Sequence, residues 1–351
     1  MIYMGVPNIQ GIGTAVPKYA LQQGEIKNFI AVLFQDHVDH LDRLLPVFEN
    51  CCIETRHLSR PLDWYKTTHS FAEANTIFEE VALDLAEEAA LQAMEMGKVE
   101  VEDVGMIIFL SSTGITTPTL DAKLMQRLGL SPHTKRLPIW GLGCGGGVAG
   151  LARAAELAPS LSGKSVLLVT VELCSLTFQQ NDYSKSNLVG TSLFADGAAA
   201  VLLNTKGDGP EIHGSYSTLF SNSAHVMGWD LVDTGFKVRF SRDIPSIVRQ
   251  YLPQILRNAC LTWGILEEKI CHYIMHPGGA KVLSAYRDSL GLCEEDLTHA
   301  YEILRCYGNM SSASVLFVLA KYLKDTTPKG AYGLMLALGP GFSAEQVLIK
   351  W

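Results

Sequence analysis

The sequence predicts an α/β fold built from two copies of one unit of strands and helices. At 351 residues the chain is long enough for two such units. Apolar runs such as VGMIIFL and KSVLLVTV are typical of strands that helices cover on both faces. The pattern also repeats at an offset of 165 residues, which aligns Asp103 with Glu268 and Lys164 with Lys329. Each copy therefore reads as acidic turn, strand, glycine turn, helix, lysine and strand.

In the first half, segments with helical periodicity alternate with apolar strands. The opening VPNIQGIGTAVPKYALQQ predicts a strand and a Gly/Pro turn. Helices are expected at residues 21–50, 70–97, about 120–130 and about 145–160. Buried strands are expected in VGMIIFLSSTG, RLPIW, KSVLLVTVE and FADGAAAVLLNT. Strands alternating with helices imply mostly parallel or mixed sheets between helical layers.

The second half repeats this scheme after a polar, glycine-containing segment at 205–215. We place the domain boundary there, which gives an N-terminal half at 1–205 and a C-terminal half at 206–351. Helices are expected near 243–263, 281–289 and 310–324. Strands are expected in KICHYIMHPGG and, joined by a Gly-Pro-Gly turn, in YGLMLALGPGFSAEQVLIKW.

The composition limits the classes of function. A net charge of −8 makes a nucleic-acid partner unexpected, so an anionic substrate would need a local group of Lys and Arg. None of the eight cysteines has CxxC spacing, so neither a zinc site nor a redox dithiol is expected. No apolar run reaches transmembrane length and the N-terminus lacks a signal-peptide pattern, so a cytoplasmic location is expected.

Cys144 lies in WGLGCGGGVAGLARAAELA, where a strand ends, glycines allow a sharp turn and a helix begins. Glycine neighbours permit a positive φ and let a substrate approach closely. Unpaired N–H groups at the start of the helix would favour the thiolate and lower the pKa of the thiol. A free cysteine is more often a small buried hydrophobic residue, but this glycine-rich helix start favours a nucleophile.

Two further residues are expected near Cys144. His276, in YIMHPGGAK, follows a buried strand, and the offset aligns it with Ser111. Asn309, in CYGNMSSAS, aligns with Cys144 itself. A lone histidine is usually structural, and Gly-Asn before a helix is an ordinary N-cap. Strand ends open onto the ligand crevice of α/β sheets, however. The imidazole and the amide would there donate hydrogen bonds to a thioester or enolate oxygen.

With these motifs identified, the chain resembles the type III polyketide synthases, the chalcone synthase-like branch of the thiolase superfamily. The resemblance extends from about residue 50 to the end and rests on GLGCGGG, LVGTSLFADGAAAV, HPGG, YGNMSSASVLF and ALGPGFSAE. It implies a thiolase-like five-layered αβαβα fold, a homodimer, CoA thioesters as substrates, and no metal or other cofactor. Cys144 would match the acyl-accepting nucleophile. His276 and Asn309 would match the pair that decarboxylates a malonyl unit and stabilises its enolate.

The resemblance also implies roles around the cavity. Phe194 falls at the gatekeeper position, where core packing is the alternative. Thr177 and Ser311 fall at cavity-lining positions, and Val238 stands where plant enzymes have a second gatekeeper Phe, which would widen the entrance. A substrate contact is expected from Thr117, which lies on a loop that in plant relatives sends a Met into the partner's cavity. Gly341 in the GPGF turn is expected to line the cavity. The candidates for binding CoA are Arg43, Arg56 and Lys281. Each of these basic side chains could instead be simply solvated.

The expected reaction is an acyl transfer. A CoA-linked starter is condensed with several malonyl-CoA units. A fatty acyl starter is expected, because CCIETRHL resembles bacterial family members and because Val238 replaces the second gatekeeper Phe. The product then cyclises to a pyrone or resorcinol. One alternative is a single-round enzyme similar to β-ketoacyl synthase III. Another is a catalytically silent binding subunit with the same fold.

Overall fold

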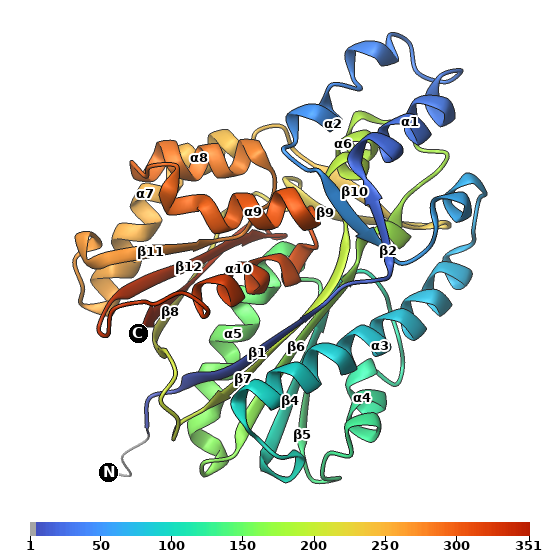
Figure 1. Cartoon of the computed structure of the whole chain (residues 1–351). Coiled ribbons are helices and arrows are strands. Elements are labelled where there is room, and N and C mark those ends of the chain that lie inside the picture. The colour runs from blue at the N-terminus through green and yellow to red at the C-terminus, as the bar shows by residue number, and fades with distance from the viewer. Residues whose placement is uncertain (1–4) are drawn as a thin grey trace.

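The structure, a computed structural model, describes residues 5–351 and confirms the predicted α/β class. Within the described residues, nine strands form one mixed ladder (Figure 1). Their order across the ladder is β5 (Lys135–Trp140), β4 (Val104–Ser111), β6 (Ser165–Leu173), β7 (Asp196–Asn204), β1 (Asn8–Ala15), β8 (Glu211–Leu219), β13 (Ser343–Lys350), β12 (Tyr332–Gly339) and β11 (Ile270–Met275).

The ladder is two half-sheets that meet at β1 and β8, where a single register pair, Asn8 and Glu211, joins them. In the first half β4 and β6 are parallel, whereas β6–β7 and β7–β1 are antiparallel. In the second half β11 and β12 are parallel, whereas β12–β13 and β13–β8 are antiparallel. The same pairing pattern therefore runs outward from the junction in both directions, as the offset in the sequence predicts.

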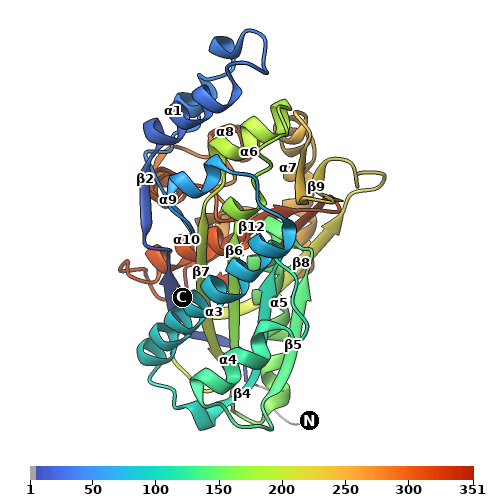
Figure 2. The same cartoon turned by 90° about the vertical axis from the view of Figure 1, so that its right-hand side faces the viewer.

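Helices complete five layers. The outer face of the first half-sheet is covered by α3 (Phe71–Gly97), which packs on β1, β6 and β7, and by α4 (Leu120–Leu128), which packs on β4 and β5 (Figure 2). Between the half-sheets lie α5 (Gly146–Leu157) and α10 (Ser314–Tyr322), which contact strands of both. Beyond the second half-sheet lies α7 (Ile244–Trp263) with α8 (Ala280–Leu290), and α9 (Thr298–Tyr307) packs beside α10.

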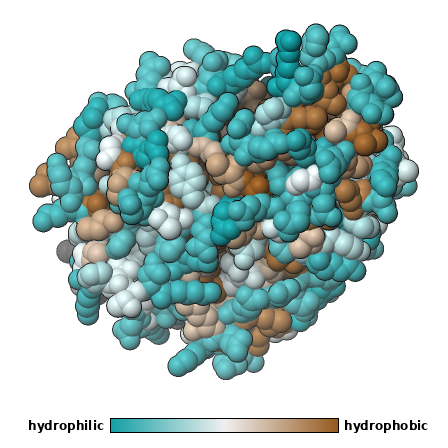
Figure 3. All heavy atoms as spheres, turned by 45° about the horizontal axis from the view of Figure 1, so that its top comes forward, coloured by the Kyte–Doolittle hydropathy of each residue, from teal (hydrophilic) through white to brown (hydrophobic). Residues whose placement is uncertain are grey.

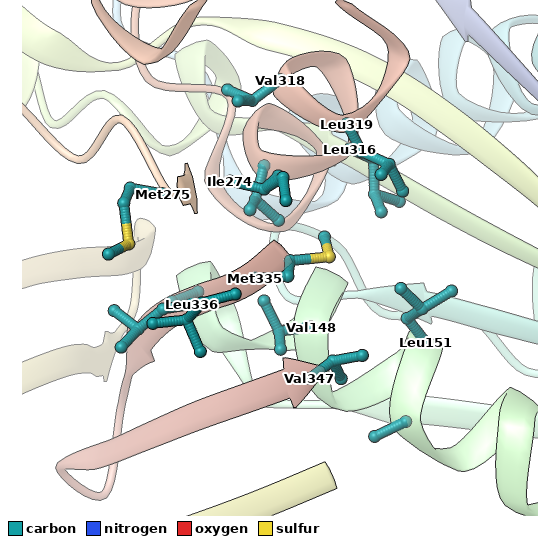
Figure 4. Close-up of a cluster of buried hydrophobic side chains, with 14 of the residues drawn as sticks. Val148, Leu151, Ile274, Met275, Leu316, Val318, Leu319, Met335, Leu336 and Val347 are labelled. Atoms are coloured by element: carbon teal, nitrogen blue, oxygen red, sulfur yellow. The ribbon is translucent and has the colours of Figure 1, made fainter. Parts of the chain in front are cut away.

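The main hydrophobic core surrounds the middle helices and includes side chains of both half-sheets, and Figure 4 shows a part of it beside the second half-sheet. Val148 and Leu151 on α5 point toward Met335 and Val347 on the adjacent strands. Because strands such as β6 are covered on both faces, every residue of SVLLVTVEL is buried. This two-sided burial explains the nearly continuous apolar runs in the sequence.

Smaller elements form a cap above one end of the sheets (Figure 1). They are β2 (Tyr19–Gln22), α1 (Gln23–Phe34), α2 (Val47–Asn50), β3 (Thr55–Leu58), α6 (Lys185–Leu193), β9 (Met227–Val232) and β10 (Gly235–Phe240). The prediction of one helix over 21–50 is wrong. His40 adopts a left-handed φ of 54°, and Pro46 lacks the N–H that a continuous helix needs, so the helical segments are separate.

The other predicted helices and strands are confirmed to within a few residues. The sequence reading did not separate α6, α9, β8, β9 or β10, because these segments are short or lack a clear period. None of the helices in residues 5–351 is long and apolar enough to cross a membrane.

Candidate active site

The functional candidates meet in a cavity of about 600 Å³ that residues of both halves line. Cys144, His276 and Asn309 all line it, although they come from three separate segments. Each is nearly buried, with exposed fractions of 6%, 2% and 2%. The structure thus brings together the three residues that the sequence placed at the junction of the halves.

Two equivalent glycine turns hold Cys144 and Asn309. Gly143 precedes Cys144 with a φ of 46°, and Gly308 precedes Asn309 with a φ of 71°, both in the left-handed region. A side chain at Gly143 would also come within 2.8 Å of Pro340. Glycine is therefore required at these turns both for backbone conformation and, at Gly143, for space.

The orientation of the Asn309 amide is fixed by its neighbours. Its Oδ1 accepts a hydrogen bond from the backbone N–H of Ser311 at 2.9 Å and lies 4.0 Å from Cys144 Sγ. Its Nδ2 donates to the carbonyl oxygen of Gly278 at 3.2 Å. Nδ2 carries two hydrogens, so one donor remains for a ligand in the cavity.

His276 lies just after β11, and its backbone N–H donates to the carbonyl oxygen of Leu336 at 2.9 Å. Neither of its ring nitrogens has a hydrogen-bond partner among the described residues. Burial lowers the pKa of His276 to about 3, so the imidazole is neutral at pH 7. A buried imidazole with both nitrogens free is available to exchange hydrogen bonds or a proton with a substrate.

The pKa of Cys144 is shifted in the direction opposite to the expectation from its helix start. Burial, partly offset by a hydrogen bond with the Ser311 side chain, raises the pKa of Cys144 to about 12. The carboxylate of Glu172 adds to this rise. Loss of water around the sulfur outweighs the partial charge at the start of α5, so the thiol is protonated at pH 7.

Glu172, a residue the sequence reading missed, lies at the end of β6 behind the cysteine and is fully buried. Its carboxylate accepts hydrogen bonds from the Ser112 backbone N–H at 2.9 Å and the Thr113 hydroxyl at 2.9 Å. It also accepts from the Ser312 hydroxyl at 2.8 Å, and burial raises its pKa to about 7. The available signal was one acidic residue ending a wholly apolar strand, which is costly unless it is fully hydrogen-bonded.

Exposed cations surround the cavity. Its lining includes Arg43, Lys185, Arg242 and Lys281, and no Asp or Glu is among the lining residues. Within the described part of the chain, none of the four lies within salt-bridge distance of a carboxylate. Figure 3 views the molecule from the capped end and shows a mainly hydrophilic surface with interspersed hydrophobic groups. In a chain of net charge −8, Arg43, Lys185, Arg242 and Lys281 form the local basic cluster that an anionic substrate needs.

The expectation for Arg56 is corrected. Arg56 is only 2% exposed, and its Nη1 donates to the carbonyl oxygens of Thr191 at 2.6 Å and Phe194 at 2.7 Å. These carbonyls lie at the C-terminal end of α6, where a cation is favourable. Arg56 therefore holds the backbone at Phe194 instead of lying at the surface to meet a phosphate.

The predicted gatekeepers form a wall of the cap. Phe194, Val238 and Thr177 line a separate small chamber of about 50 Å³. Val238 packs against Phe194. Phe240, two residues later on β10, lines the main cavity, and its ring centroid lies 5.5 Å from that of Phe194. The wide entrance expected from Val238 is thus flanked by a second aromatic residue, since alternate residues of a strand face the same side.

The remaining candidates lie in different places. Ser311 is buried beside Cys144 and donates from its hydroxyl to Glu172 at 3.4 Å. Gly341 is exposed in the turn after β12 and does not line the main cavity, so its predicted role is corrected. Leu338 lines the cavity instead, one strand residue before the turn begins. Thr117 is exposed on the loop before α4, and its contact with substrate stays a prediction.

Comparison with known proteins agrees with this geometry. A family model described as chalcone and stilbene synthases, N-terminal domain, matches residues 3–207, and the model of the C-terminal domain matches residues 211–351. A protein of Bacillus subtilis (strain 168) named "Putative chalcone synthase" is 44% identical over 98% of both chains. The 1,3,6,8-tetrahydroxynaphthalene synthase of Streptomyces peucetius is 37% identical over 98% of this chain and 93% of its own.

Solved structures show the same fold. The 1,3,6,8-tetrahydroxynaphthalene synthase of Streptomyces coelicolor, titled a bacterial type III polyketide synthase, superposes with a TM-score of 0.93. It shares 27% identity, and the match covers 98% of this chain and 99% of that one. The C-terminal type III polyketide synthase domain of Steely1 from Dictyostelium gives a TM-score of 0.91 at 29% identity, with 98% and 99% of the chains covered.

Proposed function

The chain belongs to the chalcone and stilbene synthase family of type III polyketide synthases, which are acyltransferases, and from this premise we propose a specific reaction for it. A CoA-linked acyl starter is condensed with several malonyl-CoA units, and the chain cyclises to a pyrone or resorcinol-type product. The single observation that carries the proposal is the convergence of Cys144, His276 and Asn309 in one buried cavity with a basic rim.

Cys144 is the proposed nucleophile. The thiol and the imidazole are both neutral at pH 7, because burial raises the pKa of Cys144 and lowers that of His276. His276 takes the thiol proton as sulfur bonds to the carbonyl carbon of the starter thioester, and then returns it to the departing CoA sulfur. The products of this step are the Cys144 thioester and free CoA, so no metal or prosthetic group is required.

The proposed roles of His276 and Asn309 follow in the second step. Malonyl-CoA loses CO₂, and the electron pair of the broken C–C bond becomes an enolate whose oxygen accepts hydrogen bonds from the His276 ring and Asn309 Nδ2. The enolate carbon attacks the Cys144 thioester and releases the cysteine sulfur. Neutral donors fixed in a water-poor site stabilise such an oxyanion without reorganisation. Transfer of the lengthened chain back to Cys144 releases CoA and permits another round.

The cavity supports a CoA thioester as substrate. Arg43, Lys185, Arg242 and Lys281 are placed where the phosphates of CoA would remain outside while the acyl group enters. The lining also includes apolar side chains, with Leu188, Val189, Leu193, Met227 and Val282. An apolar lining favours a fatty acyl starter.

A second candidate comes from the relatives. The 37% identical protein of Streptomyces peucetius is named for 1,3,6,8-tetrahydroxynaphthalene, an aromatic product. As the second candidate we propose such an aromatic product, built from malonyl-CoA without a separate starter. We favour the fatty acyl starter because of the apolar lining, and we also propose that the enzyme acts as a homodimer in the cytoplasm.

One experiment tests both candidates. The purified protein is incubated with acetyl-, hexanoyl-, lauroyl- and palmitoyl-CoA, each with ¹³C-malonyl-CoA, and with ¹³C-malonyl-CoA alone, and the products are analysed by mass spectrometry. We expect several labelled two-carbon units added to a long-chain starter. A single added unit would establish the single-round alternative, and product from malonyl-CoA alone would establish the second candidate. No acylation of Cys144 and no product under any condition would indicate a silent subunit.

A further inference from the structure

Tyr286 carries a buried hydroxyl for which the fold provides no partner. The residue lies on α8, its exposed fraction is 0%, and its hydroxyl makes no hydrogen bond to any described residue. Buried hydroxyls are nearly always hydrogen-bonded, because leaving one unpaired costs the free energy of its lost hydration. An unpaired hydroxyl in the interior therefore calls for a ligand or a function.

The other buried tyrosines of the described chain differ in this respect. The Tyr65 hydroxyl lies 2.6 Å from Ser175 Oγ. The Tyr322 hydroxyl lies 3.4 Å from the carbonyl oxygen of Tyr273 and 3.3 Å from that of Asp296. Neither Tyr65 nor Tyr322 lines the main cavity, whereas Tyr286 does. The unpaired hydroxyl is thus found on the buried tyrosine that faces the reaction space.

Tyr286 belongs to the wall of the cavity that also holds the reacting groups. Val282 and Tyr286 are four residues apart on α8, so they share a helix face, and both line the cavity with Cys144 and His276. Burial raises the pKa of the Tyr286 phenol, and a negative charge at Cys144 would raise it further. The phenol is therefore protonated at pH 7 and can donate a hydrogen bond.

The cavity lining also includes apolar side chains, among them Ile244, Pro245, Leu338 and Val282. A hydrocarbon starter would leave the hydroxyl unpaired. Each round of extension, in contrast, adds a carbonyl group to the chain. A buried donor discriminates strongly between ligands that can pair with it and ligands that cannot.

We propose that the Tyr286 hydroxyl donates a hydrogen bond to a keto oxygen of the poly-β-keto chain growing from Cys144, which makes Tyr286 a specificity-determining residue for chain length. This inference rests on the proposed function, since it requires repeated extension. The interaction is absent from the starter thioester and is gained only after extension. It therefore favours retention and further extension of the chain over its early release.

The test is Tyr286→Phe, which removes the hydroxyl and keeps the ring. We expect acylation of Cys144 by the starter, followed by intact mass, to proceed at the wild-type rate. The fraction of product with the full number of extensions should fall about tenfold, with a matching gain of shorter, early-released products. Because no protein partner is lost, the melting temperature should stay the same or rise.

Tyr322→Phe is the matched control. It also removes one buried tyrosine hydroxyl, but one that is paired and remote from the cavity. It should lower the melting temperature and leave the product distribution unchanged. The inference is overturned if Tyr286→Phe leaves the product distribution unchanged, slows starter acylation, or lowers the melting temperature as Tyr322→Phe does. If the wild-type protein itself adds no more than one malonyl unit, the proposed function fails along with the inference.

Discussion

The turn that carries Cys144 and the turn that carries Asn309 share a positive-φ glycine but carry different chemistry. Each has a glycine with positive φ, a buried polar residue and then a helix of the middle layer. The first half presents a sulfur, and the second half presents an amide 4.0 Å away. The comparison teaches that the duplicated backbone supplies position, whereas the side chain at that position supplies the reaction.

The strand ends repeat this contrast. Ser111 ends β4 and His276 follows β11, at equivalent places in the two halves. Ser111 is buried and does not line the main cavity, whereas His276 lines it with both ring nitrogens free. Together the halves form an asymmetric site in which a nucleophile faces two hydrogen-bonding groups.

The largest effect is expected from Cys144→Ala. Starter loading should vanish in intact-mass spectra, and product formation should fall by about 10⁴-fold or more, because the variant lacks the sulfur that accepts the acyl chain. Cys260→Ala, at a buried cysteine on α7 that does not line the cavity, should behave as wild type. Acylation of Cys144→Ala at the wild-type level would disprove the assignment of the nucleophile.

A second experiment compares His276→Gln with its counterpart Ser111→Ala. His276→Gln should slow release of ¹⁴CO₂ from labelled malonyl-CoA by about 10²–10³-fold, since it replaces the imidazole by an amide of different shape and so displaces the donor aimed at the enolate oxygen. Ser111→Ala should change the rate by less than about twofold, because that side chain does not reach the cavity. Equal losses in the two variants would mean that position in the fold, and not the imidazole, is what matters.

The rim should contribute less than the interior. The double variant Arg242→Ala/Lys281→Ala should raise the KM for acyl-CoA about tenfold at low salt and leave kcat nearly unchanged. An N-acetylcysteamine thioester of the same acyl group lacks the CoA phosphates, so its kinetics should not change. Lys329→Ala, which removes an exposed charge that does not line the cavity, is the control. Equal effects on both thioesters would argue against phosphate binding at the rim.

The smallest expected effect concerns stability and pH. The pKa of His276 is about 3 in the folded protein, below the 6.5 of an unperturbed histidine, so the unfolded chain binds the proton more readily between these values. The stability that His276 contributes as a neutral group is complete above pH 6.5 and is lost as the pH falls toward 3. At pH 5 the loss in the free energy of unfolding is about 2 kcal/mol.

Urea unfolding at pH 7.5 and pH 5 measures this effect. The drop in the free energy of unfolding between the two pH values should be smaller in His276→Gln than in wild type by about 2 kcal/mol. His57→Gln is the control, because it alters a histidine outside the cavity. An identical drop in wild type and His276→Gln would show that the imidazole is not buried in solution.

Much of the site could be predicted from the sequence, because the features that define it are local or periodic. Glycines around Cys144 and before Asn309 mark positive-φ turns, and HPGG marks the end of a buried strand. The duplication then links these distant segments through one offset. The rim cations Lys185 and Arg242 were missed because nothing local distinguishes an exposed basic residue at a cavity from one elsewhere.

The sequence by itself determined the α/β class, the doubled architecture and the identity of the three converging residues. Apolar periodicity and glycine turns depend only on residues that are neighbours in the chain. Only the tertiary structure decided the ionisation of those residues, because desolvation depends on everything packed around a group. It raised the pKa of Cys144 where the helix start alone would lower it, and it moved Arg56 from an expected surface role into the interior. It likewise left the Tyr286 hydroxyl at the cavity without a hydrogen-bond partner among the described residues, which no local sequence pattern predicts.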